Sequence, residues 1–213
     1  MTPGFDLNED DQDIVTEVIN IGVGRAAAAL SRMIGEEVRM VAPSTEILSR
    51  PAAAALLGNL TNDKIMGVRQ EFVGPLTGVA ALVFPEKRSL EIVRAVVGSD
   101  YPIEDITELE QETLLEIGNI LLNNCLGTIS NIFQARSTAS LPVLVQGTAE
   151  ELFCRDTEDQ AGDGMVLFLH IGFSVRSRDV TGYLTFILDL ATAEKFIGFI
   201  HAYLETAQKG GGI

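Results

Sequence analysis

The sequence predicts an α+β fold made of two copies of one helix-strand-helix-strand-strand-helix unit, related by a pseudo-twofold axis. Three observations predict this fold: a polar quartet that occurs twice, long runs with helical apolar spacing, and two pairs of apolar strands joined by short turns. The two copies are expected to form one sheet of roughly six largely antiparallel strands, packed by helices. We therefore expect a single domain over 1–213, with internal repeat units at about 8–98 and 107–205.

The first repeat unit begins with a long amphipathic helix. Apolar residues recur at helical spacing from Ile14 to Met33, which places them on one face of the helix. Later in the unit, Val73-Gly74-Pro75 is a short turn between two apolar runs and predicts an antiparallel hairpin. The other expected elements are, in order, a strand at 38–41, a short helix at 49–57, strands at 64–72 and 76–84, and a closing helix at 89–97.

The second unit follows the same plan. Its long helix runs from Leu114 to Phe133, and Arg176-Ser177-Arg178 is the turn of its hairpin. The offset between matching positions grows from 99 to 104 residues, and the segment 156–164, rich in Asp, Glu and Gly, is where the extra loop residues are expected. The other expected elements are a strand at 137–141, a short helix at 148–154, strands at 165–175 and 181–188, and a closing helix at 192–203.

Both units contain a quartet of three polar residues and a proline, with identical spacing. The quartets are Asp13, Glu17, Asn20 and Pro43 in the first unit, and Glu112, Glu116, Asn119 and Pro142 in the second. Positions i, i+4 and i+7 share one face of a helix, so each unit presents a polar stripe, which Gly24 extends in the first copy and Asn123 in the second. Each proline is expected to mark a strand end or a sheet edge. Packing alone does not require a repeated carboxylate and amide, so the stripes are candidate functional sites.

The overall charge limits the possible partners. The chain has a net charge of −15 and no Trp, which argues against nucleic acid and against an anionic membrane surface. At 46% hydrophobic residues and 213 residues, it is long and apolar enough to bury a good core. The sequence does not begin with a charged segment followed by an apolar core, the pattern of a signal peptide. No apolar run approaches the roughly eighteen residues of a membrane span, so a cytoplasmic location is expected. Proteins are the favoured partners.

The remaining reactive side chains are expected to be structural. Cys125 and Cys154 have neither metal-ligand spacing nor a disulfide framework, and His170 and His201 have no counterpart in the other unit. The segment 22–27 fits the loose G-x-G-x-x-A dinucleotide pattern, but it lies within a helical run without the strand that such a site needs before it. We expect no metal site and no cofactor of the protein's own.

The pairing of an amide with a carboxylate suggests a specific chemistry. An amide can donate to one oxygen and accept from a water without changing charge, so it can orient an attacking water. A carboxylate beside it can pair with a cationic group of the substrate. The stripes contain no strong nucleophile and too few metal ligands, so any metal would have to come with the substrate.

The quartets, together with the sequence Glu116-Ile117-Gly118-Asn119-Ile120, resemble the CheC, FliY and CheX family of bacterial chemotaxis phosphatases, and within it the CheC branch, which has two copies and no appended domain. The resemblance covers about 8–205. It implies dephosphorylation of the aspartyl phosphate of the response regulator CheY, with Mg²⁺ carried by the regulator. Glu17 and Glu116 would contact the regulator's lysine, and Asn20 and Asn119 would place the water in line with phosphorus. Similar proteins also bind the receptor deamidase CheD.

The sequence departs from the family pattern at two positions. Glu112 stands where Asp or Ser is usual, and Ile19 precedes Asn20 where the second unit has Gly118. The branched side chain of Ile19 is expected to hinder close docking at the first amide. A non-catalytic adaptor that binds CheD or a response regulator is the alternative function, and a flagellar switch component is a weaker third.

Overall fold

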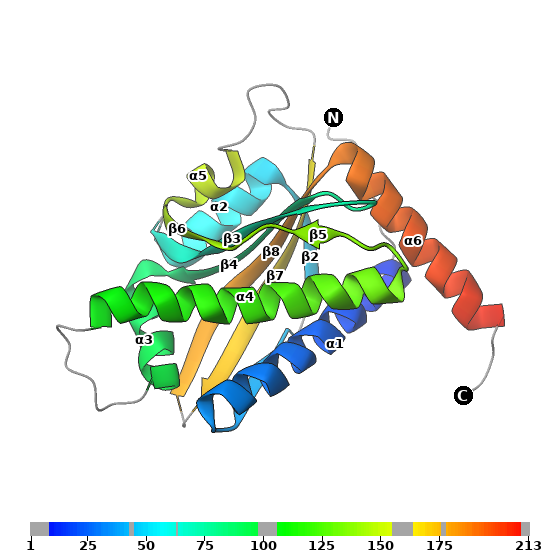
Figure 1. Cartoon of the computed structure of the whole chain (residues 1–213). Helices are drawn as coiled ribbons and strands as arrows, with labels where there is room; N and C mark the ends of the chain where they lie inside the picture. Colours follow the sequence, from blue (N-terminus) through cyan, green and yellow to red (C-terminus); the bar gives the residue numbers. More distant parts are fainter. Residues whose placement is uncertain are drawn as a thin grey trace.

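The structure is a computed structural model that describes residues 9–42, 45–62, 64–97, 106–154, 164–175 and 178–209. The described residues form an α+β fold, as the sequence predicts (Figure 1). The first unit comprises α1 (Glu9–Ile34), β1 (Val38–Val41), β2 (Thr45–Ser49), α2 (Arg50–Thr61), β3 (Ile65–Val73), β4 (Gly78–Pro85) and α3 (Glu86–Val97). The second unit comprises α4 (Ile106–Ile132), β5 (Thr138–Ala139), β6 (Val143–Gly147), α5 (Ala149–Cys154), β7 (Gly164–Val175), β8 (Arg178–Asp189) and α6 (Leu190–Lys209).

The strands form one antiparallel sheet in the order β1-β7-β8-β4-β3-β5. Two further strands, β2 and β6, pair with β7 and β3 alongside β1 and β5, so the described sheet has eight strands in six positions across. The sequence analysis missed β2 and β6. Each is five residues long with a single buried position, because it lies at a sheet edge, and so neither shows the alternating apolar pattern on which strand prediction depends.

The two repeat units interleave in this sheet. The short strands β1 and β2 of the first unit pair with β7 of the second, whereas β5 and β6 of the second unit pair with β3 of the first. At the centre, β4 and β8 pair with each other, with Gly78 opposite Leu188 and Val83 opposite Tyr183. Each unit thus supplies the short edge strands that pair with the hairpin of the other unit.

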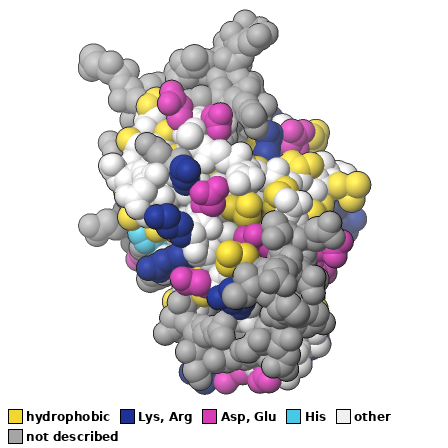
Figure 2. Space-filling model, turned by 90° about the vertical axis from the view of Figure 1, so that its left-hand side faces the viewer, with side chains coloured by type: hydrophobic (Ala, Val, Ile, Leu, Met, Phe, Trp, Pro, Cys, Tyr) yellow, Lys and Arg dark blue, Asp and Glu magenta, His cyan; other side chains and the backbone are white. Residues whose placement is uncertain are grey.

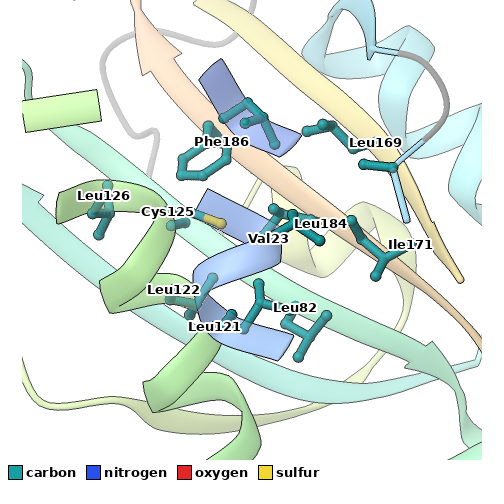
Figure 3. Close-up of a cluster of buried hydrophobic side chains, with 14 of the residues drawn as sticks. Val23, Leu82, Leu121, Leu122, Cys125, Leu126, Leu169, Ile171, Leu184 and Phe186 are labelled. Carbon is teal, nitrogen blue, oxygen red and sulfur yellow. The ribbon is translucent and has the colours of Figure 1, made fainter. Parts of the chain in front are cut away.

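Helices cover both faces of the sheet. The larger core lies under α1, α4, α3 and α6, where Val23, Leu122 and Cys125 meet Leu82, Leu184 and other strand residues (Figure 3). A smaller core on the opposite face is formed by Leu57 of α2 and Phe153 of α5 against the strands. Burial of these apolar side chains supplies the main driving force for the fold.

The two long helices α1 and α4 run in opposite directions over the same face of the sheet (Figure 1). They approach closely at Gly22, where a Cβ atom would lie 2.8 Å from the Cα atom of Cys125. Close to this contact, Arg25 Nη1 donates a hydrogen bond to Thr128 Oγ1 at 3.3 Å. The glycines of the 22–27 segment therefore lie inside a helix, and the requirement for a preceding strand in the dinucleotide pattern is not met.

The length and apolarity of α1 correct one expectation from the sequence. A stretch of 18 residues within Asp11–Ile34 has a mean hydropathy of 1.3, so by length and composition alone this helix could cross a membrane. In the structure this helix packs on α4 and the sheet, with Val15, Val18 and Leu30 in the main core. The apolar side of α1 is the side that faces protein.

Candidate functional site

The first polar stripe lies on the exposed side of α1. Asp13, Glu17 and Asn20 are all exposed, one turn apart along the helix. The Oδ1 atom of Asn20 accepts a hydrogen bond at 3.2 Å from the backbone N–H of Ala42, which directly follows β1. This bond orients the carboxamide, and it leaves the Nδ2 donor and a second lone pair on Oδ1 available to a ligand.

The second stripe lies on α4 and is held differently. Glu112 and Glu116 are exposed, whereas Asn119 is half-buried. The Oδ1 atom of Asn119 accepts a hydrogen bond at 2.6 Å from Nδ2 of Asn123, one turn further along the helix. Orientation of this carboxamide therefore comes from a neighbouring side chain, not from the backbone of the following strand.

Asn123 is itself tied to the sheet through Gln70 of β3. The Nε2 atom of Gln70 donates to Asn123 Oδ1 at 3.4 Å and to the backbone oxygen of Ser140 at 2.6 Å. Gln70 is 3% exposed, so its amide is fixed by the surrounding protein. Ser140, Gln70 and Asn123 form a chain of contacts that ends at Asn119.

The two stripes form two separate sites. Asn20 is anchored at the β1 edge of the sheet, and Asn119 is linked through Gln70 and Ser140 to the β3–β5 edge, at the opposite end of the strand order. Each site combines a Glu and an Asn of one helix with the segment that follows an edge strand. The structure thus brings Glu17 together with Asn20, and Glu116 together with Asn119, but not the two pairs with each other.

The spacing of 22 residues between each Asn and its Pro has a structural meaning in the first unit. Ala42, the residue before Pro43, is the partner of Asn20, while Pro43 itself lies outside the described residues. In the second unit, Pro142 is half-buried and lies between β5 and β6. Leu141, which corresponds to Ala42, is 85% exposed.

The side chain of Ile19 does not obstruct the first amide. Ile19 is 1% exposed and belongs to the main core. Its counterpart Gly118 is also buried, and a Cβ atom there would lie 2.6 Å from Cβ of Val68 on β3. Both positions face the sheet, so the expectation that Ile19 hinders docking at the first amide is wrong.

The reactive side chains outside the stripes have structural surroundings. Cys125 is buried in the main core, and burial raises the pKa of its thiol to about 12, whereas the side chain of Cys154 lies outside the described part. His201 Nε2 lies 3.2 Å from Oδ2 of the buried Asp11. His170 packs edge-on against Tyr183. Within the described ranges, no three His, Cys, Asp or Glu side chains are grouped to hold a metal ion.

Sequence reasoning missed two residues that position the amides. Ala42 acts through its backbone N–H, which no side-chain pattern can reveal. Gln70 is buried on the side of β3 where the other residues, Met66, Val68 and Phe72, are apolar. This polar residue in an apolar series was the sequence signal that could have identified it. Asn123 was placed on the second stripe by spacing, but its contact with Asn119 was not predicted.

Comparison with known proteins finds relatives of the chain. No protein-family model matches the chain. The chain is 27% identical over 139 residues to the CheY-P phosphatase CheC of Bacillus subtilis, covering 64% of this chain and 66% of that protein. It is 23% identical over 193 residues to the flagellar motor switch phosphatase FliY of B. subtilis, covering 88% of this chain and 50% of that protein. The matched regions thus span about two thirds and one half of these relatives.

The fold agrees with these sequence matches. The solved structure of Thermotoga maritima FliY superposes with a TM-score of 0.72 at 17% identity, covering 93% of this chain and all of that one. At this identity the likeness establishes the fold, and the sequence matches connect that fold with CheC and FliY. The repeated Glu-x-x-Asn stripes and these similarities lead to one conclusion: the chain is similar in sequence to the bacterial proteins CheC and FliY and shares the fold of FliY.

Proposed function

We propose that this protein is a phosphatase that hydrolyses the aspartyl phosphate of a CheY-type response regulator. The observation that carries the proposal is the repeated pair of a Glu and an oriented Asn on one helix face, each completed by an edge segment of the sheet. The similarity to CheC and FliY supports the same reaction. We place the reaction in the cytoplasm, where response regulators act.

In the proposed reaction the amide of Asn20 or Asn119 orients the attacking water. The carboxamide accepts from the water and donates to a phosphoryl oxygen, which places the water in line with phosphorus without any change of charge on the protein. The existing hydrogen bonds to Ala42 and Asn123 hold each amide before the substrate arrives, so little ordering is needed on binding.

The exposed carboxylates of Glu17 and Glu116 would pair with the lysine of the regulator's active site. The pair forms when the two proteins dock, so these carboxylates act mainly in binding and alignment. Mg²⁺ would be carried by the regulator and would neutralise charge on the phosphoryl group. We propose CheD as a second protein partner, on the family resemblance alone.

The test is hydrolysis of ³²P-labelled regulator by purified variants. We expect Asn20→Ala and Asn119→Ala to retain part of the activity, because the two sites lie at opposite edges of the sheet and act independently. The double variant should lose nearly all acceleration. The loss should appear in kcat, because water orientation is a transition-state effect, whereas Glu17→Gln combined with Glu116→Gln should chiefly raise KM.

A matched control is Asn131→Ala, an exposed Asn near the end of α4. Substitutions of this kind usually change stability by only about 0.5 kcal/mol, so circular dichroism should show all the variants folded. A folded Asn20→Ala/Asn119→Ala protein that hydrolyses the phosphate at the parental rate would remove both amides from the mechanism. If the parent protein binds the phosphorylated regulator but releases phosphate no faster than the regulator alone, the adaptor function is favoured.

A further inference from the structure

A cavity of about 560 Å³ lies away from both polar stripes, between the end of α2, the start of α3 and β8. Its walls include Leu60 and Thr61 of α2, Pro85 at the end of β4, and Thr181 and Tyr183 of β8. Its volume falls in the range of about 300–1,000 Å³ that is usual for sites of small molecules. The cavity has both an apolar and a polar wall.

Cationic side chains gather at this cavity in a strongly acidic protein. Lys64, Lys87 and Arg88 line it, together with one carboxylate, Glu86. Figure 2, which views the side of the molecule where α3 lies, shows several Lys and Arg side chains on this face, with Asp and Glu side chains between them. The chain as a whole has 15 Lys and Arg against 30 Asp and Glu, so a local excess of positive charge is unexpected.

The carboxylate of Glu86 is already engaged by other residues. Its Oε1 atom accepts a hydrogen bond at 3.0 Å from Gln146 Nε2 of β6, and its Oε2 atom lies 4.0 Å from Lys64 Nζ. Lys87 and Arg88, by contrast, form no ion pair with any described residue. These two cations at the cavity therefore lack a carboxylate at salt-bridge distance within the described protein.

Tyr183 supplies a hydroxyl donor at the wall of the cavity. The residue is 5% exposed, it lines the cavity, and its hydroxyl forms no hydrogen bond with a described residue. Burial raises the pKa of Tyr183, and the positive charge of Arg88 offsets part of that increase. The ring of Tyr183 packs edge-on against the ring of His170, with centroids 5.2 Å apart. The hydroxyl can therefore donate a hydrogen bond to a ligand in the cavity.

The first turn of α3 adds further donors. The N–H of Glu86 donates to the backbone oxygen of Lys64 at 3.0 Å, but the next N–H groups of a helix have no intrahelical acceptor. The positive end of the helix dipole also lies at this turn. These donors reinforce the preference of Lys87, Arg88 and Tyr183 for an anion.

We propose that this cavity binds a small phosphorylated molecule, with its oxyanion held by Arg88, Lys87 and the hydroxyl of Tyr183 and its less polar part against Leu60 and Pro85. A phosphate offers several acceptor oxygens and accepts a bidentate contact from Arg, which matches this donor set. The net charge of −15 weakens the attraction only modestly at physiological salt, because charges beyond about 8 Å are screened. The proposal does not depend on the phosphatase reaction.

The test is isothermal titration of the full-length protein with pyrophosphate and with ADP at physiological salt. We expect saturable binding of both, with ADP bound more tightly because its nucleoside part contacts the apolar wall. Arg88→Gln and Tyr183→Phe should each weaken binding by about fivefold or more, the amount expected for one charge-assisted or buried hydrogen bond. Both variants should keep parental phosphatase activity, so failure here is distinct from failure of the proposed function.

Arg32→Gln is the charge-matched control, since Arg32 is exposed in the last turn of α1, away from the cavity. It should leave the affinity unchanged. The proposal is overturned if neither probe binds, or if Arg32→Gln weakens binding as much as Arg88→Gln does, which would indicate non-specific attraction. Binding of a hexaglutamate peptide in place of both phosphate probes, with the same dependence on Arg88, would also overturn it in favour of an acidic protein segment.

Discussion

The two catalytic amides that we propose differ in what holds them, although their helices carry the same motif. Asn20 is oriented by a backbone N–H, whose position is set by the path of the chain after β1. Asn119 is oriented by the side chain of Asn123, which depends in turn on Gln70. Side-chain support can be removed by a single substitution, whereas backbone support cannot.

Removal of Asn123 should therefore impair the second site selectively. We expect Asn123→Ala to lower the phosphatase activity of an Asn20→Ala protein by about two- to tenfold, the equivalent of one hydrogen bond of roughly 0.5–1.5 kcal/mol. The same substitution should have no effect in an Asn119→Ala protein, which depends on the first site. Steady-state hydrolysis of the labelled regulator measures both effects, and an equal loss in the two backgrounds would show that Asn123 acts otherwise.

The thiol of Cys125 should report on the packing of α1 against α4. Its pKa is raised by burial from 9.0 to about 12, so the folded protein holds the thiol neutral while the unfolded chain ionises near pH 9. The resulting contribution to stability is complete below pH 9 and is lost as the pH rises from 9 towards 12, at up to about 1.4 kcal/mol per pH unit. Urea unfolding of the parent and of Cys125→Ala across this range measures it, and parallel curves for the two proteins would contradict it.

At the scale of elements, the close packing of α1 against α4 depends on Gly22. A second glycine two residues later, Gly24, faces open space. A Cβ atom at Gly22 would meet the Cα atom of Cys125 at 2.8 Å, whereas a Cβ atom at Gly24 would have nothing within 4 Å. The two positions lie in the same helix and differ only in whether they face α4. They form a natural test and control.

We expect Gly22→Ala to destabilise the protein by about 1–3 kcal/mol, the usual cost of overpacking a contact. Gly24→Ala should stabilise it by roughly 0.5–1 kcal/mol, because Ala is the better helix former and its side chain has room. The measurement is the free energy of unfolding in urea for both variants. Similar changes of the same sign would show that the helices do not approach at Gly22 as described.

Helical periodicity and repetition were enough to predict α1, α4 and the polar stripes. The sidedness of single positions was harder to infer, as Ile19 and Gly118 show: a residue next to the Asn is rotated by about 100° around the helix, which here carries it to the sheet. The edge strands β2 and β6 could not be predicted, because they pair on one side and bury too little to leave a pattern. The linkage of Asn119 to Gln70 depends on long-range pairing, which local sequence does not encode.

At the scale of the whole molecule, the two repeat units share one sheet in which each provides the outer strands of the other. The sequence-based expectation of a single domain therefore has a direct test. Urea or thermal unfolding should show one cooperative transition, monitored by both circular dichroism and tyrosine fluorescence. Separately produced fragments covering 1–98 and 107–213 should each be poorly structured at low concentration and should regain native circular dichroism when mixed. Two resolved transitions, or a fragment that folds fully alone as a monomer, would contradict it.

The exchange of outer strands also suggests how such a chain could have arisen. A single ancestral unit would have lacked partners for its short strands, and two copies meeting around the β4–β8 seam would have supplied them to each other as a symmetric, strand-exchanged pair. Fusion of the two genes would have preserved every contact while freeing the two copies from identical selection. The backbone-held Asn20 and the side-chain-held Asn119 are the kind of divergence that such a fusion permits.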